Sequence, residues 1–447
     1  MAAQRDRRLP WTRGRQVTVD FEGQPVTAYE GEPLAVALFA SGVGVLSRSI
    51  KFHRPRGFFC LAGDCAACLM RVDGRPNIRA CRVPVRAGLR CERQNAWPSA
   101  GLDLLETADL FFPESMDHHG LMTSPRALNL LLRATVRKLS GLGRLPDAAP
   151  QFESLPRAQA RHVDLVVVGA GPAGLRAAAV VAERRPAARV LVLEAADRAG
   201  GSYLSHPDHG PEAAAAAQAR ALAAGVELML STQAVGWYPE DRAPGQRQPG
   251  LLCAASPQGL LKLTARRYLY ATGAHDQNAL FCNNDRPGVM AARACGLLLC
   301  TYGVLPGRQP VVLGDGPYAR ALAAALERAG AEARCVDGTR RRVVGVRGRS
   351  WVRAVEVVDA AGRHEELPCD LLAVAVLPAP ASELPQQHGV AVDFARAGGF
   401  GAVCAPDGRT AVPEVFCAGD VAGFAGVVAA EQSGQAAGVA LAAELGG

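Results

Sequence analysis

The sequence lacks the features that would place the protein in a membrane or outside the cell. Its 447 residues contain no run of roughly 18 or more apolar residues, the length that a membrane-spanning helix needs. The first residues, MAAQRDRRLPWTRGRQ, are basic but carry no apolar segment of the kind found in secretory signals. Thirteen cysteines spread over a long chain do not fit a secreted disulfide framework. We therefore expect a cytoplasmic protein with no membrane span.

Aromatic residues and net charge are also low. Aromatic residues make up 5% of the chain, and the net charge of +7 comes from arginines scattered along it, so we do not expect a nucleic-acid partner. The 48 glycines suit a fold with many tight turns between strands and helices. A chain of this length with 49% hydrophobic residues can bury several cores.

The chain divides into three parts with different patterns. Residues 17–95 contain short strand-like segments, the last of them in ACRVPVRAG, together with one apolar helical stretch, PLAVALFASGV, and a loop with three cysteines. Residues 98–160 have mixed composition and are interpreted as a connector. From residue 163 onward, buried strands, glycine turns and helices alternate, as in dinucleotide-binding domains.

These patterns predict an α/β fold with two nested Rossmann-like domains, arranged as in glutathione reductase, after a small α+β domain of the β-grasp type. The small domain is expected at 1–97, followed by the connector at 98–160. An FAD-type domain is expected at 161–305 and 373–447. The second, NAD-like domain is expected at 306–372, between the two parts of the first.

Four cysteines have the spacing of an iron–sulfur site. Cys60, Cys65, Cys68 and Cys81 form the pattern C-x4-C-x2-C-x12-C, whose first three positions match a plant-type [2Fe–2S] loop. A structural zinc site would favour two separated C-x2-C pairs, and only one is present here. We predict that these four cysteines bind a [2Fe–2S] cluster, with a vestigial or zinc-filled loop as the alternative.

The residues between the cysteines favour this arrangement. The pair Asp73-Gly74 predicts a hairpin turn that returns Cys81 to the loop. Gly63 would allow a positive φ where the backbone passes close to a sulfide. Cys91 lies ten residues after Cys81, and we expect it not to be a ligand because the shorter loop closes more easily.

The segment VVVGAGPAGL predicts the first nucleotide site. Gly169 would make the turn, Gly171 would admit a pyrophosphate at the helix N-terminus, and Gly174 would let the helix pack on the strand. Glu194 ends the next strand, where a carboxylate can bind ribose hydroxyls. The residues expected in this site are Gly169, Gly171, Pro172, Ala173, Gly174 and Glu194. FAD is the first choice of cofactor, and NAD and ATP stay open for the same site.

Two later segments complete a flavoprotein pattern. YLYATGAHDQ places Thr272 and Gly273 at the end of a strand, and VFCAGDVAG places Gly419 and Asp420 where an acidic group can accept hydrogen bonds from ribityl hydroxyls. The alternative for Asp420 is the N-cap of the last helix.

A second glycine turn, VVLGDGPYARAL, has Gly314 and Gly316, with Ala319 in the third position. Asp337 ends the strand that follows, so the segment predicts an NAD-like site. However, Leu377 stands where reductases of this architecture commonly carry glycine, which would keep a nicotinamide away from the backbone. We therefore do not expect physiological use of NAD(P)H.

The segments RSIKFHRPRGFFC and FCNNDRPGVMAARACGLLLCTYGVLPG resemble the α subunits of heteromeric sarcosine oxidase and of related proline, hydroxyproline and opine dehydrogenases. Many sarcosine oxidase α chains lack the four cysteines that are present here. The resemblance implies an electron-transfer subunit that is inactive on the amine alone. Its partner would be a flavoprotein β subunit of the amino-acid-oxidase type, and a further small subunit is left open. An FMN shared with the partner, near Arg54 and Arg56, is also left open.

Other interpretations of these segments stay open at this point. The run Arg48, Lys51, His53, Arg54 and Arg56 also suits a solvated basic face, and Asn283, Asn284 and Asp285 also suit a simple turn. Two rival functions are a self-sufficient NAD(P)H-dependent ferredoxin-type reductase and a non-redox nucleotide-binding scaffold subunit. We assign no catalytic residue to this chain, because it shows no catalytic triad or paired carboxylates.

Overall fold

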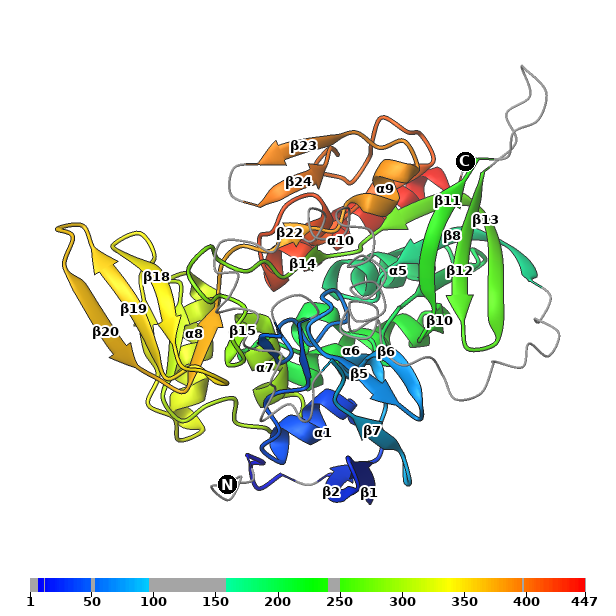
Figure 1. Ribbon diagram of the computed structural model, residues 1–447. Helices are drawn as coiled ribbons and strands as arrows, with labels where there is room; N and C mark the ends of the chain where they lie inside the picture. The colour runs from blue at the N-terminus through cyan, green and yellow to red at the C-terminus, as the bar shows by residue number, and fades with distance from the viewer. Residues whose placement is uncertain are drawn as a thin grey trace, which may run out of the picture. The chain divides into compact units, whose positions relative to one another are not determined.

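The computed structural model describes residues 7–11, 13–49, 53–95, 158–239, 250–395 and 398–446. Their contacts divide the chain into two units, one with the described residues of 1–151 and 278–375, the other with those of 152–277 and 376–447 (Figure 1). The domain limits expected from the sequence stay predictions. Lys51 and all but the last three residues of the predicted connector lie outside the described residues. In the described part of the chain, no helix is both long and apolar enough to cross a membrane.

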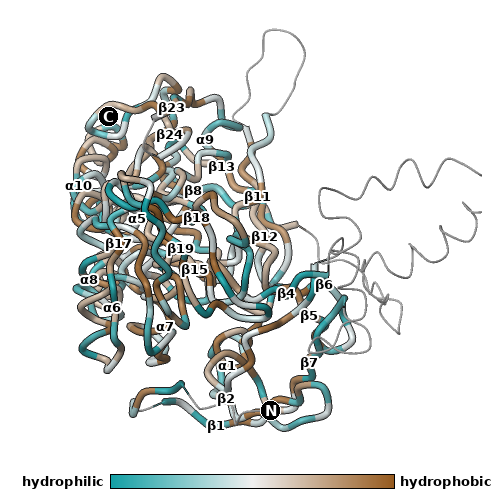
Figure 2. The backbone as a smooth tube through the Cα atoms, turned by 60° about the vertical axis from the view of Figure 1, so that its left-hand side comes forward, coloured by the Kyte–Doolittle hydropathy of each residue, from teal (hydrophilic) through white to brown (hydrophobic). Residues whose placement is uncertain are grey.

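The first unit begins with a small mixed sheet in the order β2-β1-β7-β5-β6. Helix α1 (Leu34–Ala40) packs on it with all seven residues buried, and Figure 2 colours this helix as largely hydrophobic. This confirms the helix that PLAVALFASGV predicts. The strands are β1 (Gln16–Phe21), β2 (Gln24–Tyr29), β5 (Leu69–Val72), β6 (Arg75–Arg79) and β7 (Arg90–Glu92), with the separate pair β3 (Ser47–Arg48) and β4 (Pro55–Arg56).

The strand expected in ACRVPVRAG is wrong. The segment starts with a 3-10 turn, η1 (Ala80–Arg82), and strand β7 begins only at Arg90. The turn forms because the amide of Ala80 donates to the carbonyl of Cys68, which holds Cys81 at the cysteine loop. The carbonyl of Val83 then accepts from the amide of Leu34 at the start of α1.

The rest of the first unit, residues 278–375, is here called the second lobe. Its parallel sheet has the order β15-β21-β16-β17, and a three-stranded antiparallel sheet, β18-β19-β20, follows β17 in the chain. The alternation of buried strand, glycine turn and helix around Gly314 is the one predicted. The elements are β15 (Val289–Ala291), α7 (Ala292–Cys300), β16 (Pro310–Leu313), α8 (Pro317–Arg328), β17 (Arg334–Val336), β18 (Arg341–Arg347), β19 (Ala354–Asp359), β20 (His364–Pro368) and β21 (Leu371–Val374).

One hydrophobic core runs through the whole first unit. It joins residues of the small sheet and α1, such as Phe39 and Met70, to residues of α7 and α8, such as Leu298 and Leu322. All four side chains are almost fully buried. The small N-terminal domain and the second lobe therefore stabilise each other through shared apolar packing.

The second unit is built on a seven-stranded sheet with the path β10-β9-β8-β13-β12-β11. The long strand β13 pairs with β8 on one side, and on its other side with β12 and then β25. The strands are β8 (Gln159–Val168), β9 (Val190–Leu193), β10 (Glu227–Met229), β11 (Gln233–Tyr238), β12 (Leu251–Ser256), β13 (Gly259–Tyr270) and β25 (Val415–Cys417). Short elements complete it: β14 (Ala274–His275), β22 (Ala379–Pro380), α9 (Glu383–Gln387), β23 (Val392–Ala395), β24 (Gly399–Ala402), η3 (Gly201–Tyr203) and η4 (Gly419–Val421).

Helices α5 (Pro172–Arg184) and α10 (Val427–Glu444) pack closely in this unit, while α6 (Gly210–Ala223) packs on α5. Two glycines make the approach of α10 possible. A Cβ on Gly434 would lie 2.2 Å from the carbonyl oxygen of Ala173, and one on Gly438 would lie 2.9 Å from that of Ala177. Any larger residue at these positions would push α10 off the helix that follows the first glycine turn.

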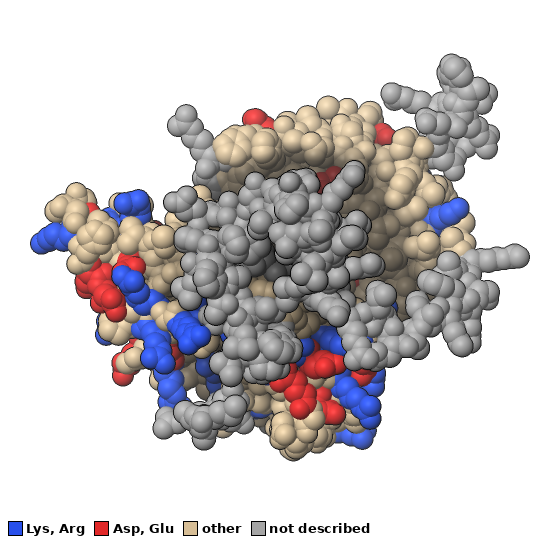
Figure 3. Space-filling model, viewed as in Figure 1, with Lys and Arg blue, Asp and Glu red and all other residues tan. Residues whose placement is uncertain are grey.

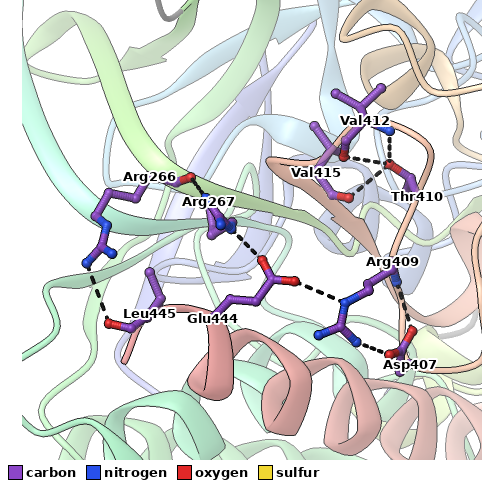
Figure 4. A network of polar contacts seen from close by, with 9 residues as sticks. All are labelled: Arg266, Arg267, Asp407, Arg409, Thr410, Val412, Val415, Glu444 and Leu445. Atoms are coloured by element: carbon purple, nitrogen blue, oxygen red, sulfur yellow. Dashed lines mark hydrogen bonds and ion pairs between the residues drawn. The ribbon is translucent and has the colours of Figure 1, made fainter. Parts of the chain in front are cut away.

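The C-terminal end of α10 is fixed by charge. Glu444 accepts from Arg267 on β13 at 2.6 Å and from Arg409 at 3.0 Å, and Arg409 also pairs with Asp407 (Figure 4). Because one carboxylate bridges two guanidinium groups, the last helical turn is tied both to the sheet and to the loop before β25.

Candidate functional site

The four predicted cysteines meet in the first unit as two pairs of thiols. Sγ of Cys60 donates to Sγ of Cys65 at 3.3 Å, and the side chains of Cys68 and Cys81 are hydrogen-bonded to each other. Three of the four are buried, and Cys65 is partly exposed. Within the described residues, no group of three or more His, Cys, Asp or Glu side chains is placed to hold a metal ion. The arrangement is one of two thiol pairs, which suits a cluster with two irons.

Each pair contains one thiol that loses its proton more easily. The hydrogen bond from Cys60 lowers the pKa of Cys65 to about 6, and the bond from Cys81 lowers the pKa of Cys68. The same two bonds raise the pKa values of the donors, Cys60 and Cys81. Since the thiolate is the form that binds metal, the donor set fits an iron–sulfur cluster.

The backbone of the cysteine loop (residues 57–68) is shaped for this site. Gly63 has a φ of +90°, as predicted, and the side chain of Arg82 covers it. The amides of Ala62 and Cys65 each donate to Sγ of Cys60 at 3.4 Å. Amide donors to sulfur of this kind would also stabilise a cluster thiolate.

The hairpin that returns the fourth cysteine is confirmed. β5 and β6 pair antiparallel around Asp73 and Gly74, whose φ values are +48° and +74°. At the base of the hairpin, the amide of Ala80 donates to the carbonyl of Cys68 at 3.0 Å. This bond places Cys81 beside Cys68.

Cys91 has a different environment. It lies on β7 between β1 and β5, and its thiol donates to the carbonyl of Asp20 at 3.6 Å. Burial raises the pKa of Cys91 to about 12. The thiol of Cys91 is therefore bonded to the backbone of a strand and not to another thiol.

The first glycine turn, in the second unit, has the geometry expected of each glycine. A Cβ on Gly169, whose φ is +106°, would lie 2.3 Å from the carbonyl oxygen of Ala271, and one on Gly174 would lie 1.9 Å from that of Gly169. A Cβ on Gly171 would meet its nearest atom, Cα of Gly201, only at 3.9 Å. Two glycines are therefore required by the fold, whereas Gly171 leaves space at the N-terminus of α5, beside Pro172 and Ala173.

Glu194 follows β9, and its carboxylate is hydrogen-bonded to the backbone of the first glycine turn. Its carboxylate accepts from the amide of Ala170 at 2.8 Å and from that of Ala196 at 2.8 Å. The side chain therefore lies at the glycine turn, where the sequence places it, and also fixes the turn's backbone. Its predicted contact with ribose stays a prediction.

The later segments return to the same region. The hydroxyl of Thr272 donates to the carbonyl of Ala381 at 2.6 Å, and Gly273 has open space around its Cα. A Cβ on Gly419 would lie 2.8 Å from Cβ of Ala173, which places Gly419 against the start of α5. Asp420 is buried in η4 and accepts from the amide of Ala425.

The alternative of Asp420 as the N-cap of the last helix is wrong. Helix α10 begins at Val427, and its N-cap is Gly426, with a φ of +88°. The chain makes a separate 3-10 turn between the strand and the helix. That turn leaves Asp420 buried next to Gly419 instead of capping α10.

The sequence analysis missed two further glycines, Gly200 and Gly201, beside the first glycine turn. A Cβ on Gly201 would lie 2.9 Å from Cα of Gly171, and Gly200 has a φ of +128°. Just after them, the buried Tyr203 donates to the carboxylate of Glu431 on α10, and burial raises the pKa of Tyr203. The signal was the Gly-Gly pair after β9, which indicates a close backbone approach.

The second glycine turn, in the second lobe, is also open. A Cβ on Gly316 would meet nothing within 4 Å, and Ala319 is buried under Gly314. However, Asp315, between the two glycines, is exposed and adds a carboxylate to the turn. Asp337 accepts from Thr339 and pairs with Arg340, so its pKa is lowered. The position that carries Leu377 is exposed in the other unit.

The basic segment is only partly a solvated face. Arg48 and His53 are buried, and Nη1 of Arg48 donates to the carbonyl of His53 at 2.7 Å. Nη1 of Arg56 lies 2.9 Å from the carboxylate of Asp285, and the amide of Arg54 donates to Ser49. Positive and negative side chains are interspersed on the face of the molecule shown in Figure 3.

The two segments on which the family resemblance rests are thus joined by the ion pair of Arg56 and Asp285. The turn before Pro287 is also present, since Asn283 has a φ of +61° and its carbonyl accepts from the amide of Arg286. The turn interpretation and the pairing with the basic segment hold together, because Asp285 belongs to both.

Comparisons with known proteins agree with this geometry. Residues 14–96 match the family described as a 2Fe-2S iron-sulfur cluster binding domain, and residues 163–347 match the family described as pyridine nucleotide-disulphide oxidoreductase. The sarcosine oxidase α subunit of Rhizobium meliloti is 31% identical over 414 aligned residues, and the match covers 83% of this chain. The chain is homologous to sarcosine oxidase α subunits over most of its length. The resemblance seen in the sequence is thereby confirmed.

The chain spans 40% of the length of the Rhizobium meliloti subunit. Its N-terminal region is also 40% identical, over 79 residues, to the hydrogen cyanide synthase subunit HcnA of Pseudomonas aeruginosa, covering 18% of this chain and 75% of that one. The crystal structure of L-proline dehydrogenase from P. horikoshii matches with a TM-score of 0.73 and 24% identity, over 98% of this chain and 75% of that one. That likeness confirms the predicted fold class.

The two matched domains support a [2Fe–2S] cluster and FAD as the cofactors of this chain. Both were predicted from the sequence. Which side chains hold them stays a prediction, and the two thiol pairs and the space at Gly171 fit these two groups.

Proposed function

We propose that this chain is the electron-transfer subunit of a heteromeric flavin-dependent amine dehydrogenase or oxidase. Its substrate would be a secondary or N-substituted amino acid of the sarcosine, proline or hydroxyproline type, oxidised at the C–N bond by a flavoprotein β subunit. The observation that carries the proposal is one chain with two thiol pairs in its first unit and an open glycine turn in its second.

In this proposal Cys60, Cys65, Cys68 and Cys81 hold the cluster, while Gly169, Gly171, Gly174 and Glu194 hold FAD. When bound, a flavin exchanges two electrons with a substrate and a [2Fe–2S] cluster carries one at a time. The protein contributes burial of the thiols and amide donors to Cys60, which together set how readily the site is reduced.

The basic segment is proposed to face the partner. Arg54 and Arg56 lie two positions apart in the chain, and Arg56 forms an ion pair with Asp285. An FMN held between the chains at this place is part of the proposal, since guanidinium groups bind phosphate well.

The test is dye reduction with sarcosine, proline or hydroxyproline, using the tagged chain alone and then the complex purified through the same tag. We expect turnover by the complex and none by the isolated chain. Turnover by the isolated chain at the rate of the complex would overturn the subunit assignment.

A self-sufficient reductase is the second candidate, and the open space at Gly316 favours it. The carboxylate of Asp315 in the same turn opposes it. Mixing NADH with the purified chain separates the two, because rapid bleaching of the flavin absorption would support the reductase.

A further inference from the structure

We infer that Trp351 in the second lobe is a positioning residue for the cysteine loop, so that this lobe serves to hold the iron–sulfur site. The inference rests on the proposed cluster ligands, Cys60, Cys65, Cys68 and Cys81. It gives the second lobe a role that does not depend on binding a dinucleotide.

The indole of Trp351 lies directly on two glycines. A Cβ on Gly44 would lie 2.4 Å from Cζ3 of the ring, and one on Gly288 would lie 2.9 Å from Cε2. Gly44 belongs to the N-terminal domain and has no positive φ, so the ring itself is what excludes a side chain there. Only glycine allows the ring to approach the backbone this closely.

A third glycine joins this seam to the cysteine loop. A Cβ on Gly57, at the start of the loop, would lie 2.8 Å from the carbonyl oxygen of Gly44 and 3.3 Å from Cβ of Pro287. We call Gly44, Gly57 and Gly288 the glycine seam. At the glycine seam, the cysteine loop and the second lobe both lie close to the segment around Gly44, which follows α1.

The ring is locked in place from its other sides. Its Nε1–H donates to the carbonyl of Asp370 at 2.6 Å, and the guanidinium of Arg7 lies 5.5 Å from the ring centre. The ring of Phe39 is 6.1 Å away, and Phe39 in turn packs edge-on against Phe58 at 5.2 Å. Phe58 is two residues from Cys60, so the aromatic contacts lead from the lobe to the first ligand.

The lobe also holds the loop by its backbone. The amide of Ala291, where β15 ends, donates to the carbonyl of Phe59 at 3.1 Å. Together with the packing of Phe58, this bond fixes the residues on the N-terminal side of Cys60. Cys60 is 3% exposed and accepts two amide hydrogen bonds, and both features require a fixed loop.

Loosening this contact should change the cluster itself. The reduction potential of such a cluster depends on solvent exposure and on hydrogen bonds to its sulfurs. The reduced cluster carries one more negative charge than the oxidised one, so water reaching Cys60 stabilises the reduced form. We therefore expect Trp351→Leu to raise the midpoint potential and to speed the loss of iron to a chelator.

The experiment compares Trp351→Leu and Trp351→Phe with wild type in the full-length chain. Potentials come from a dye-mediated titration followed by EPR, and iron release from the decay of visible circular dichroism with a chelator. Trp351→Phe keeps a ring on the glycine seam and should restore most of both properties. Trp237→Leu, at a partly buried tryptophan of the second unit, is the matched control and should change neither.

Gly44→Ala tests the same contact from the other side. Its methyl group would meet the indole, so it should reproduce the effect of Trp351→Leu, and in the Trp351→Leu background it should add little. A folded Trp351→Leu chain with wild-type potential and wild-type iron release overturns the inference. A wild-type chain that contains no cluster would instead overturn the proposed function.

Discussion

At the scale of single residues, neighbouring positions in the glycine turns and among the cysteines differ in which substitutions they tolerate. Gly169 and Gly174 have backbone atoms where a side chain would be, whereas Gly171 and Gly316 face open space. Cys81 is hydrogen-bonded to another thiol, whereas Cys91 is bonded to a backbone carbonyl. Substitutions can therefore be chosen that remove a ligand and leave the fold intact.

Cys81→Ser should abolish or strongly alter the visible absorption and the EPR signal of the reduced cluster, because it removes one thiol of the pair with Cys68. Cys91→Ser should keep both signals, because its thiol lies between β1 and β5. Both variants should be measured as purified full-length chains with iron and sulfide analysis. The opposite pattern would show that Cys91 is the fourth ligand.

Gly171→Val should give a folded chain without its FAD. The valine fits an unstrained φ of −82° and the open space at the turn, which is the space a pyrophosphate needs. Gly316→Val, at the equivalent open position of the second turn, is the control and should keep a full complement of FAD. Cofactor content after heat release, together with circular dichroism, measures both. Full FAD in Gly171→Val would place the cofactor elsewhere.

At the scale of strands and helices, one buried histidine, His388, makes the stability of the second unit depend on pH. The ring of His388 stacks on Trp237 at 3.4 Å, and its Nδ1 lies 2.9 Å from the hydroxyl of Tyr270. Tyr268 packs edge-on against it, and the carboxylate of Glu414, 3.9 Å from Nε2, is the charged group that faces it. Burial lowers the pKa of His388 to about 4.

The folded state disfavours the charged form of His388. The protein therefore keeps its full free energy of unfolding above pH 6.5, the ordinary pKa of histidine, and loses part of it as the pH falls from 6.5 toward 4. The loss in the free energy of unfolding is at most about 3 kcal/mol. His388→Phe should flatten this acid limb in urea titrations between pH 7 and 4. His364→Gln, at an exposed histidine, should retain it. Equal slopes for wild type and His388→Phe would contradict the prediction.

Local patterns in the sequence predict the elements that depend on near neighbours. The Asp73-Gly74 hairpin, helix α1 and the strand–turn–helix units around Gly169 and Gly314 follow from turn chemistry and periodicity. The strand expected after Cys81 is wrong because its amides and carbonyls pair with the start of α1. The N-cap interpretation of Asp420 is wrong because an extra turn precedes α10.

Contacts between distant segments could not be predicted. Nothing near Trp351 in the sequence points to Gly44, and a charge run does not reveal that Arg48 would be buried while Arg56 pairs with Asp285. The spacing of the cysteines predicts the ligands, because a metal cluster constrains close neighbours in the chain. It does not reveal which part of the protein holds the loop.

At the scale of the whole molecule, substitutions in the basic segment should affect assembly of the complex and stability of the chain differently. Neutralising Arg54 and Arg56 together should weaken the complex or lose its interfacial flavin while the cluster stays intact. Arg56→Gln alone should also lower the melting temperature of the chain, because it leaves Asp285 unpaired at a partly buried site. Arg75→Gln on the edge strand β6 is the control. Copurification through the tag and flavin analysis give the readouts, and an unchanged complex in the double variant would contradict this role.

The order of segments along the chain has a consequence for synthesis on the ribosome. The N-terminal domain shares its core with a lobe that is translated only after the whole first half of the other unit. Trp351 follows Phe58 by roughly 290 positions, so at about 5–20 residues per second it emerges on the order of 15–60 s later. Until Ala291 is made, roughly 230 positions after Phe58, the cysteine loop has neither that residue's amide nor Trp351 to hold it. Completion of the second lobe then adds the contacts that hold the loop.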